Sequence, residues 1–259
     1  KYIINSLKYS DFEVLGHEIE FKKEKEYPPI ELELEGGKKV EITGKIDRID
    51  IAKTSDGNYI RVIDYKSSIK NIDLNEVEAG LQLQLLTYTD AVCKKENATS
   101  AGALYFNLIE PIITASKRLT EEQIEEEIKK QFKMNGIILA DVDVVKKMDK
   151  TIENGASSII PVYINKEGNL TDKPNLINRE QFENLQKYTI RLLKQISQEI
   201  LNGNINIKPY YNIKKKSTPC DYCNYKGICN FSNGFCKNTY NYIPNRTKEE
   251  ILENIRKKV

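Results

Sequence analysis

Two apolar segments joined by a tight turn constrain the fold of this chain more than any other feature. Residues 40–52 and 59–66 are rich in Ile and Val and flank the sequence Ser-Asp-Gly-Asn at 55–58. This pattern predicts an antiparallel β-hairpin. The numbers of facing residues across such a turn add up to about 111–113, so we expect Asp47 opposite Asp64 or its neighbour.

The two aspartates would repel each other unless a third group offset their charge. Facing side chains in an antiparallel pair have Cβ atoms ~5 Å apart, and like charges there are destabilising. A hard divalent cation with oxygen ligands is the natural partner for two such carboxylates. Lys66 shares a face of the strand with Asp64, two residues earlier, whereas Tyr65 points away. A carboxylate pair beside a lysine suits metal-assisted phosphodiester hydrolysis.

An alternative interpretation leaves these charges on the exposed face of an ordinary hairpin. Arg48 and Asp50 fall at odd offsets from Asp47, so we expect them on the opposite face. The surrounding residues argue against exposure, because strands that are apolar on both faces are typical of buried sheets. Those residues are Ile46, Ile49, Ile51, Val62 and Ile63.

Residues 76–92 change to a helical period. One stripe of this predicted helix carries Val77, Leu81, Gln84, Leu85 and Tyr88. A glutamine on an apolar stripe needs a buried hydrogen-bond partner, unless it lies at the rim of the stripe. If the stripe packs on the hairpin, Gln84 and Tyr88 would reach the metal site or a DNA phosphate.

The other segments complete a mixed pattern. We expect strands at 11–21, 30–34, 101–108 and 159–164, and helices from Thr120, near 141–149, at 179–202 and at 247–258. Thr120 is followed three residues later by Gln123, which predicts a capping box. Strands, a helix, a strand and then further helices indicate a mixed α/β domain.

Composition adds a few limits. The net charge of +2 does not by itself indicate a nucleic-acid partner. No apolar run reaches 18 residues and no signal peptide precedes the first strand, so we expect no membrane span and a cytoplasmic location. Because the chain starts at Lys1 rather than Met, we expect it to be a fragment of a longer protein.

Four of the five cysteines are clustered. Cys220, Cys223, Cys229 and Cys236 lie within 17 residues, whereas Cys93 stands alone. A tight cluster in a short segment indicates a metal site rather than a disulfide framework. From spacing, a four-cysteine zinc site and an iron-sulfur cluster are equally good interpretations.

Three motifs in series resemble the PD-(D/E)xK nuclease superfamily, and within it the RecB-like branch. They correspond to the G-x-x-D, D-Y-K and Q-x-x-x-Y signatures of that branch. The matching segments are Gly44-Lys45-Ile46-Asp47, Val62-Ile63-Asp64-Tyr65-Lys66 and Gln84-Leu85-Leu86-Thr87-Tyr88. Residues 44–50, 61–68 and 74–88 look like the C-terminal nuclease domain of AddB (RexB) subunits, which belong to bacterial helicase-nucleases.

The resemblance implies an architecture and a set of roles. It implies a restriction-endonuclease-like core, a mixed sheet flanked by helices, in residues 1–202 with a helical insertion at about 111–178, and a cysteine-cluster segment at 203–259. Asp47 and Asp64 would bind Mg²⁺, and the backbone carbonyl of Tyr65 would complete the metal shell. Lys66 would be the catalytic lysine.

The same resemblance implies a reaction and its partners. Gln84 and Tyr88 would belong to the helix that contacts DNA at the active site. The chain would act as a Mg²⁺-dependent deoxyribonuclease that cleaves one strand of a DNA end during recombinational repair. An AddA/RexA-type subunit would carry the ATP motor, because this chain has no G-x-x-x-x-G-K-S/T motif.

The resemblance also decides between the zinc and iron-sulfur interpretations, although one cluster ligand is not found in this chain. Nucleases of this type end in C-x2-C-x5-C, so Cys220, Cys223 and Cys229 would hold a 4Fe-4S cluster together with a cysteine far upstream. Cys93 does not fit that fourth position, so we expect the fourth ligand outside this fragment and a partial or labile site. Zn²⁺ is the alternative.

The chain departs from the branch before its first strand. The branch has a helix with a metal-binding histidine there, and the only histidine here, His17, lies in a predicted strand. We therefore expect the fragment to begin downstream of that helix and to cleave weakly or not at all on its own. The competing hypotheses are a catalytically impaired DNA-binding or scaffolding module, and a zinc-binding interaction domain.

Overall fold

A six-stranded mixed sheet forms the centre of the molecule. The computed structural model describes residues 2–109, 112–116, 118–235 and 238–259. The order of the strands is β1-β4-β5-β6-β7-β10. Their bounds are β1 Glu13–Phe21, β4 Gly44–Thr54, β5 Gly57–Lys66, β6 Ala98–Asn107, β7 Asn135–Leu139 and β10 Leu176–Ile177. Neighbours pair antiparallel, except that β5 runs parallel to β6 and β7 parallel to β10.

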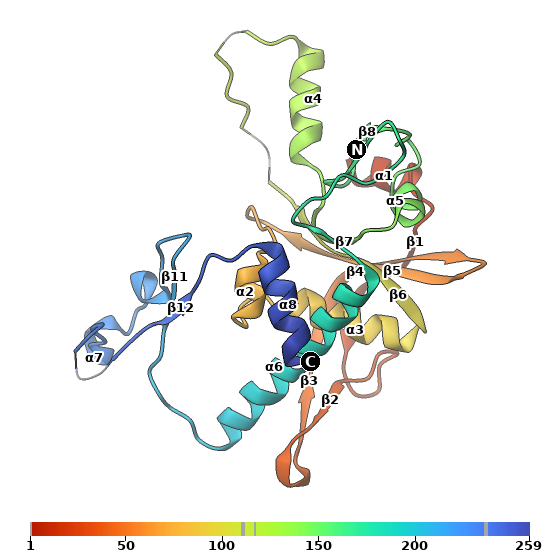
Figure 1. The fold of residues 1–259 in the computed structure, drawn as a ribbon. Coiled ribbons are helices and arrows are strands. Elements are labelled where there is room, and N and C mark those ends of the chain that lie inside the picture. The colour runs from red at the N-terminus through yellow and green to blue at the C-terminus, as the bar shows by residue number, and fades with distance from the viewer. Residues whose placement is uncertain (1, 110–111, 117, 236–237) are drawn as a thin grey trace.

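Helices cover both faces of this sheet (Figure 1). One face carries α2 (Leu74–Glu78), α3 (Gln84–Lys95), α6 (Arg179–Leu201) and α8 (Lys248–Lys258). The other face carries α1 (Tyr2–Lys8) and α5 (Val142–Met148), while α4 (Glu121–Gln131) stands away from the sheet (Figure 1). The predicted mixed α/β class with flanking helices is confirmed. No described helix has the length and apolar character that crossing a membrane requires.

Smaller elements lie at the periphery. The hairpin of β2 (Ile30–Glu33) and β3 (Lys39–Ile42) projects from one end of the molecule (Figure 1). Strands β8 (Gly155–Ala156) and β9 (Tyr163–Ile164) form a second short pair. The C-terminal region holds β11 (Tyr210–Asn212), α7 (Lys226–Cys229) and β12 (Asn241–Ile243). We call residues 208–243 the cysteine segment.

Two apolar cores, one on each side of the sheet, explain why its central strands are apolar on both faces. Ile49 and Val62 face the core beneath α3, α6 and α8. Ile63 and Ala52 face the core beneath α5. The centre of the hairpin is therefore buried: Asp64 is buried with it, whereas Asp47 and Lys66 are partly exposed.

The predicted helix at 76–92 is two helices. Gly80 has a φ of +84°, a left-handed conformation that ends α2 and that glycine adopts without strain. The break moves Leu81 out of the apolar stripe, and 41% of its surface is exposed. Two other predicted elements are also shorter or divided: 40–52 is split between β3 and β4, and of 159–164 only β9 is strand. The capping box at Thr120 and Gln123 is confirmed.

Residues 111–178 are more than a helical insertion. This stretch contains α4 and α5, but it also supplies β7 and β10 to the central sheet. Gly136 permits the pairing of β7 with β6, because a Cβ at this position would lie 2.1 Å from the carbonyl oxygen of Ala103. Its φ of +148° likewise favours glycine.

The C-terminal region packs back on the helices that cover the sheet. Ile251, Leu252 and Ile255 of α8 are buried in the core that α3 and α6 share with it. Glu76 of α2, only 8% exposed, has three partners, and two of them belong to this C-terminal region. Its carboxylate accepts hydrogen bonds from Gln82 Nε2 at 2.6 Å, Asn212 Nδ2 at 3.0 Å and Lys215 Nζ at 2.6 Å. We call this arrangement the Glu76 clasp.

Candidate active site

The hairpin places the two aspartates where the residue count predicts. Strands β4 and β5 pair Arg48 with Ile63 and Thr54 with Gly57. Asp47 precedes Arg48 and Asp64 follows Ile63, so the aspartates occupy facing positions on neighbouring strands. The Oδ2 of Asp47 accepts the backbone N–H of Tyr65 at 2.7 Å, and this bond holds the first aspartate against the second strand.

Asp64 and Lys66 lie together on the α3 face of β5. The Nζ of Lys66 is 2.6 Å from Oδ2 of Asp64 and 5.7 Å from the centre of the Tyr105 ring. Asp64 is only 6% exposed. Its Oδ2 is buried, and the ammonium of Lys66 is the charged group beside it.

The surroundings of Asp64 disfavour its charge. Burial raises the pKa of Asp64 above its ordinary value, the ammonium of Lys66 opposes that rise, and the charge of Asp47 adds to it. Burial, with a contribution from Asp64, also raises the pKa of Tyr105 to about 12. A carboxylate that is buried beside another carboxylate suits a bound cation, because the cation offsets the repulsion between them.

The donor atoms at this site fit Mg²⁺. Among the described residues, no three His, Cys, Asp or Glu side chains come together to hold a metal. Mg²⁺ is ordinarily held by one or two protein carboxylates, with water and substrate phosphate in the other positions. The pair Asp47 and Asp64 therefore provides the carboxylates that such an ion needs.

On the opposite face of the hairpin, three charged side chains form a buried support, as expected for Arg48 and Asp50. Arg48 donates to Asp50 through Nε and Nη2, both at 2.6 Å, and Arg61 Nε donates to Asp50 at 2.8 Å. Arg61 is fully buried, and its Nη1 and Nη2 have no hydrogen-bond partner among the described residues. Its guanidinium lies 4.7 Å from the centre of the Phe12 ring. Burial lowers the pKa of Arg61.

Arg61 did not stand out in the sequence. The available signal was a lone arginine within an apolar strand, opposite Asp50 in the hairpin count. Because Arg48 also donates at 3.5 Å to the hydroxyl of Tyr65, the support touches the segment that carries Asp64 and Lys66.

The Q-x-x-x-Y motif packs on the G-x-x-D motif. Tyr88 is 7% exposed and stacks on Phe21, with ring centres 5.7 Å apart. A Cβ on Gly44 would lie 2.2 Å from the Tyr88 hydroxyl, so the ring requires a glycine there. The structure therefore gives Tyr88 a positioning contact on β4, and it records no hydrogen bond from Tyr88 to Asp47 or Asp64 in the described chain.

Gln84 does not lie on a buried stripe, so that prediction is wrong. Gln84 is exposed at the start of α3, and its Nε2 donates to the Tyr88 hydroxyl at 3.3 Å. The break at Gly80 shifts the register, so that the buried glutamine is Gln82, at 8% exposure.

Gln82 orders the loop that follows Lys66. Its Oε1 accepts the N–H of Asp73 at 3.0 Å, and its Nε2 donates to the carbonyl of Asn71 at 3.3 Å and to Glu76. A sequence signal for this role was the alternation Leu-Gln-Leu-Gln at 81–84, which is not helical in period.

The cysteines are not assembled as metal ligands in the described residues. Cys220 is partly exposed, Cys223 and Cys229 are exposed, and all three are free thiols. Cys236 lies outside the described residues. Cys93 is buried in α3 within 3.2 Å of the Ser100 hydroxyl, and burial raises its pKa to about 12.

His17 is exposed on β1, where it pairs with Arg48 of β4. It belongs to no cluster of metal-binding side chains in the described part of the chain.

Comparison with known proteins agrees with this geometry. A family model described as the PD-(D/E)XK nuclease superfamily matches residues 6–230. Three similar proteins are each named as the B subunit of an ATP-dependent helicase/deoxyribonuclease. The protein of Acetivibrio thermocellus is 42% identical over 96% of this chain and 22% of its own length. The protein of Thermoanaerobacter sp. strain X514 is 40% identical over 99% of this chain and 22% of its own length. The protein of Clostridium novyi is 42% identical over 98% of this chain and 23% of its own length.

The chain thus spans less than a quarter of the length of these relatives. Its match to the family model includes Asp47, Asp64 and Lys66 on facing strands of a mixed sheet. On this sequence match and this fold, the chain belongs to the PD-(D/E)XK nuclease superfamily.

Proposed function

We propose that this chain is the nuclease domain of an AddB-type helicase-nuclease subunit, and that it hydrolyses phosphodiester bonds of one strand at a DNA end for recombinational repair. The observation that carries the proposal is the juxtaposition of Asp47, Asp64 and Lys66. The names of the relatives support the link to a helicase and to DNA. An AddA/RexA-type partner and a cytoplasmic location follow from the same proposal.

Each residue has a task in this reaction. The carboxylates of Asp47 and Asp64 would hold Mg²⁺ with the carbonyl of Tyr65. When bound, the cation supplies positive charge that stabilises the negative charge developing on the phosphate. The hydrogen bond from the Tyr65 N–H keeps Asp47 in place, and the ammonium of Lys66 orients the attacking water and neutralises charge beside Asp64.

Gln84 and Tyr88 would act as a pair that contacts DNA at the edge of the site. The exposed amide of Gln84 donates to Tyr88, whose ring is fixed by Gly44 and Phe21. The amide oxygen of Gln84 and its second N–H have no hydrogen-bond partner among the described residues, so both can meet a sugar or a phosphate.

We also propose that the cysteine segment holds a 4Fe-4S cluster. Cys220, Cys223 and Cys229 are accessible thiols in the C-x2-C-x5-C spacing, and the fourth ligand would come from outside this chain. The division into a nuclease core at 1–202 and a C-terminal segment at 203–259 belongs to this proposal. Iron content and visible absorption of the full-length subunit, prepared without oxygen, test it; stoichiometric zinc without iron would contradict it.

The decisive experiment compares cleavage by three forms of the full-length subunit with its partner. End-labelled single-stranded DNA is incubated with Mg²⁺ and wild type, Asp64→Asn or Asp56→Asn. Asp56 is an exposed aspartate at the hairpin turn and serves as the matched control. We expect Asp64→Asn to lose about a hundredfold or more in rate, and Asp56→Asn to match wild type. Equal rates for all three would indicate a scaffolding module instead.

A further inference from the structure

A basic groove lies beside the candidate active site. It has a volume of about 780 Å³. Six cationic side chains line it: Lys70, Lys173, Lys214, Lys215, Arg246 and Lys248. Only three acidic side chains do so: Asp73, Asp172 and Glu249. The lining therefore carries a net charge of about +3, more than the +2 of the whole chain, so positive charge is concentrated here.

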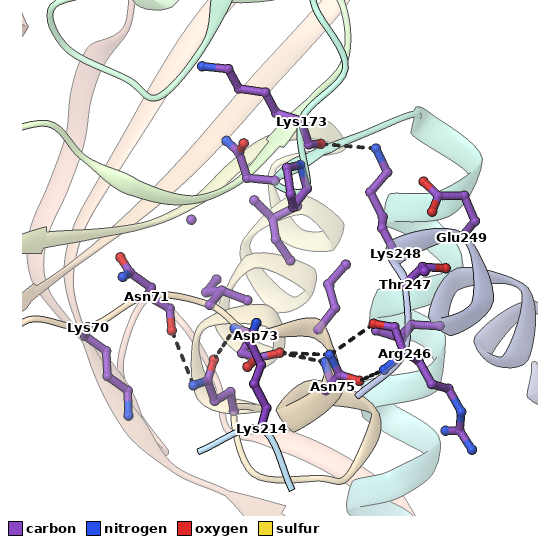
Figure 2. A pocket seen from close by; sticks show the side chains of 18 of the residues that line it. Lys70, Asn71, Asp73, Asn75, Lys173, Lys214, Arg246, Thr247, Lys248 and Glu249 are labelled. Carbon is purple, nitrogen blue, oxygen red and sulfur yellow. Dashed lines mark hydrogen bonds between the residues drawn. The ribbon is translucent and has the colours of Figure 1, made fainter. Parts of the chain in front are cut away.

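Half of these cations have no carboxylate partner. Lys215 pairs with Glu76, Arg246 with Glu78 and Lys248 with Asp172. The ammonium groups of Lys70, Lys173 and Lys214 form no ion pair with any described residue. Figure 2 shows Lys173 at one end of the groove, and Lys70 and Lys214 at the other. Free cations that are spread along a groove match the spaced charges of a nucleic-acid backbone.

The groove continues from the catalytic strand. Lys70 is four residues after Lys66, so at most ~14 Å of chain separates them. The carbonyl of Lys66 accepts the N–H of Leu108 at 2.7 Å, and the N–H of Lys70 donates to Asn107 Oδ1 at 3.0 Å. These bonds fix the start of the groove to the end of β6, at the same edge of the sheet as Asp64.

Hydrogen bonds hold the walls of the groove in shape. Gln82 anchors the backbone at Asn71 and Asp73. On the far side, the Nζ of Lys248 donates to the carbonyl of Lys173 at 3.1 Å, and Asn75 accepts the N–H of Arg246 at 2.9 Å. A preformed groove binds an extended strand without the entropy cost of ordering its walls.

We propose that the basic groove carries the single strand of DNA beyond the phosphate that is cleaved, with Lys70, Lys173 and Lys214 contacting successive parts of its backbone. This proposal rests on the proposed nuclease function. It adds to that function a path for the substrate and three binding residues that lie outside the catalytic motifs.

The first experiment locates the DNA. The cross-linking amino acid p-benzoylphenylalanine replaces Ile69, which is 77% exposed and lines the groove, in the full-length Asp64→Asn subunit with its partner. The control position is Lys53, at the opposite end of the hairpin. We expect irradiation with single-stranded DNA to yield a DNA adduct from position 69 and none from position 53. Capture of protein in place of DNA, or no adduct from position 69, would overturn the proposal.

The second experiment measures the three lysines. The groove variant combines Lys70→Ala, Lys173→Ala and Lys214→Ala. The control variant combines Lys53→Ala, Lys166→Ala and Lys187→Ala, three exposed lysines that do not line the groove and form no ion pair with described residues.

We expect the groove variant to show about a tenfold higher KM for single-stranded DNA with an unchanged kcat. The slope of the logarithm of the DNA affinity against the logarithm of the salt concentration should be reduced in size by about 2. The control variant should match wild type in both. Equal KM values and salt slopes in the two variants would refute the groove. Cleavage that persists in Asp64→Asn would refute the proposed catalytic site instead, so the two failures are distinguishable.

Discussion

The contact between Gly44 and Tyr88 links two of the nuclease motifs, and the substitution Gly44→Ala tests it. Gly44 has no left-handed backbone conformation, so only space restricts the residue at this position. An added Cβ would lie 2.2 Å from the hydroxyl oxygen of Tyr88, 2.8 Å from Cζ and 2.9 Å from Cε1. Ordinary contact begins near 3.4 Å, so the tip of the ring must move by about 1.2 Å.

The ring has little freedom to make that move. Tyr88 is 7% exposed and is stacked on Phe21. Overpacking of this kind costs about 1–3 kcal/mol. In a Tyr88→Ala background the clash is gone, and Gly44→Ala should then be neutral or stabilise by about 0.4–1 kcal/mol through the unfolded state. The expected coupling between the two positions is therefore about 1–4 kcal/mol.

Urea unfolding of wild type, both single variants and the double variant measures this coupling. Gly227→Ala is the matched control, because Gly227 has an ordinary backbone and a methyl group added there would meet no neighbouring atom within 4 Å. It should lose no stability. Tyr88→Phe should relieve the Gly44→Ala clash only in part, since Cζ remains at 2.8 Å. If Gly44→Ala costs the same with and without the Tyr88 ring, the contact is not what requires glycine.

Three further predictions follow from the charged groups. Because burial raises the pKa of Asp64, its ionised form destabilises the fold, and the stability of the protein falls as pH rises through that pKa. Without divalent ions, Asp64→Asn should therefore have a higher melting temperature than wild type at neutral pH but not near pH ~4. A lower melting temperature of Asp64→Asn at neutral pH would contradict this. Asp50→Ala leaves Arg48 and Arg61 buried without a carboxylate and should lower the free energy of unfolding, measured in urea, by about 3–5 kcal/mol. A loss under about 1 kcal/mol would show that the two arginines do not need the Asp50 carboxylate. Glu76→Ala should speed limited proteolysis of the exposed stretch 203–207, and an unchanged rate would mean that other contacts hold the cysteine segment.

The sequence was most informative where structure is local. The position of Asp47 opposite Asp64 followed from one turn, because a short turn fixes the register of both strands that it joins. The shared face of Asp64 and Lys66 followed from the two-residue period of a strand. The cap at Thr120 is equally local, and α4 begins directly after it.

The sequence was less informative where distant segments meet. One helical period drawn through Gly80 placed Gln84 in the core and left Gln82 unnoticed, because the break depends on a left-handed glycine. The basic groove combines residues near 70, 173, 214 and 246, and no local pattern connects them. The burial of Arg61 Nη1 and Nη2, which have no hydrogen-bond partner among the described residues, likewise depends on Phe12, a residue far away in the sequence.

The Glu76 clasp determines where this polypeptide can be shortened. Ending the chain after α6 would remove Asn212 and Lys215, two of the three partners of a carboxylate that is 8% exposed. It would also uncover the core surface that α8 protects with Ile251 and Ile255. A minimal nuclease therefore has to keep its last fifty residues even if the cysteines are replaced, because the scaffold depends on that segment whether or not it binds iron.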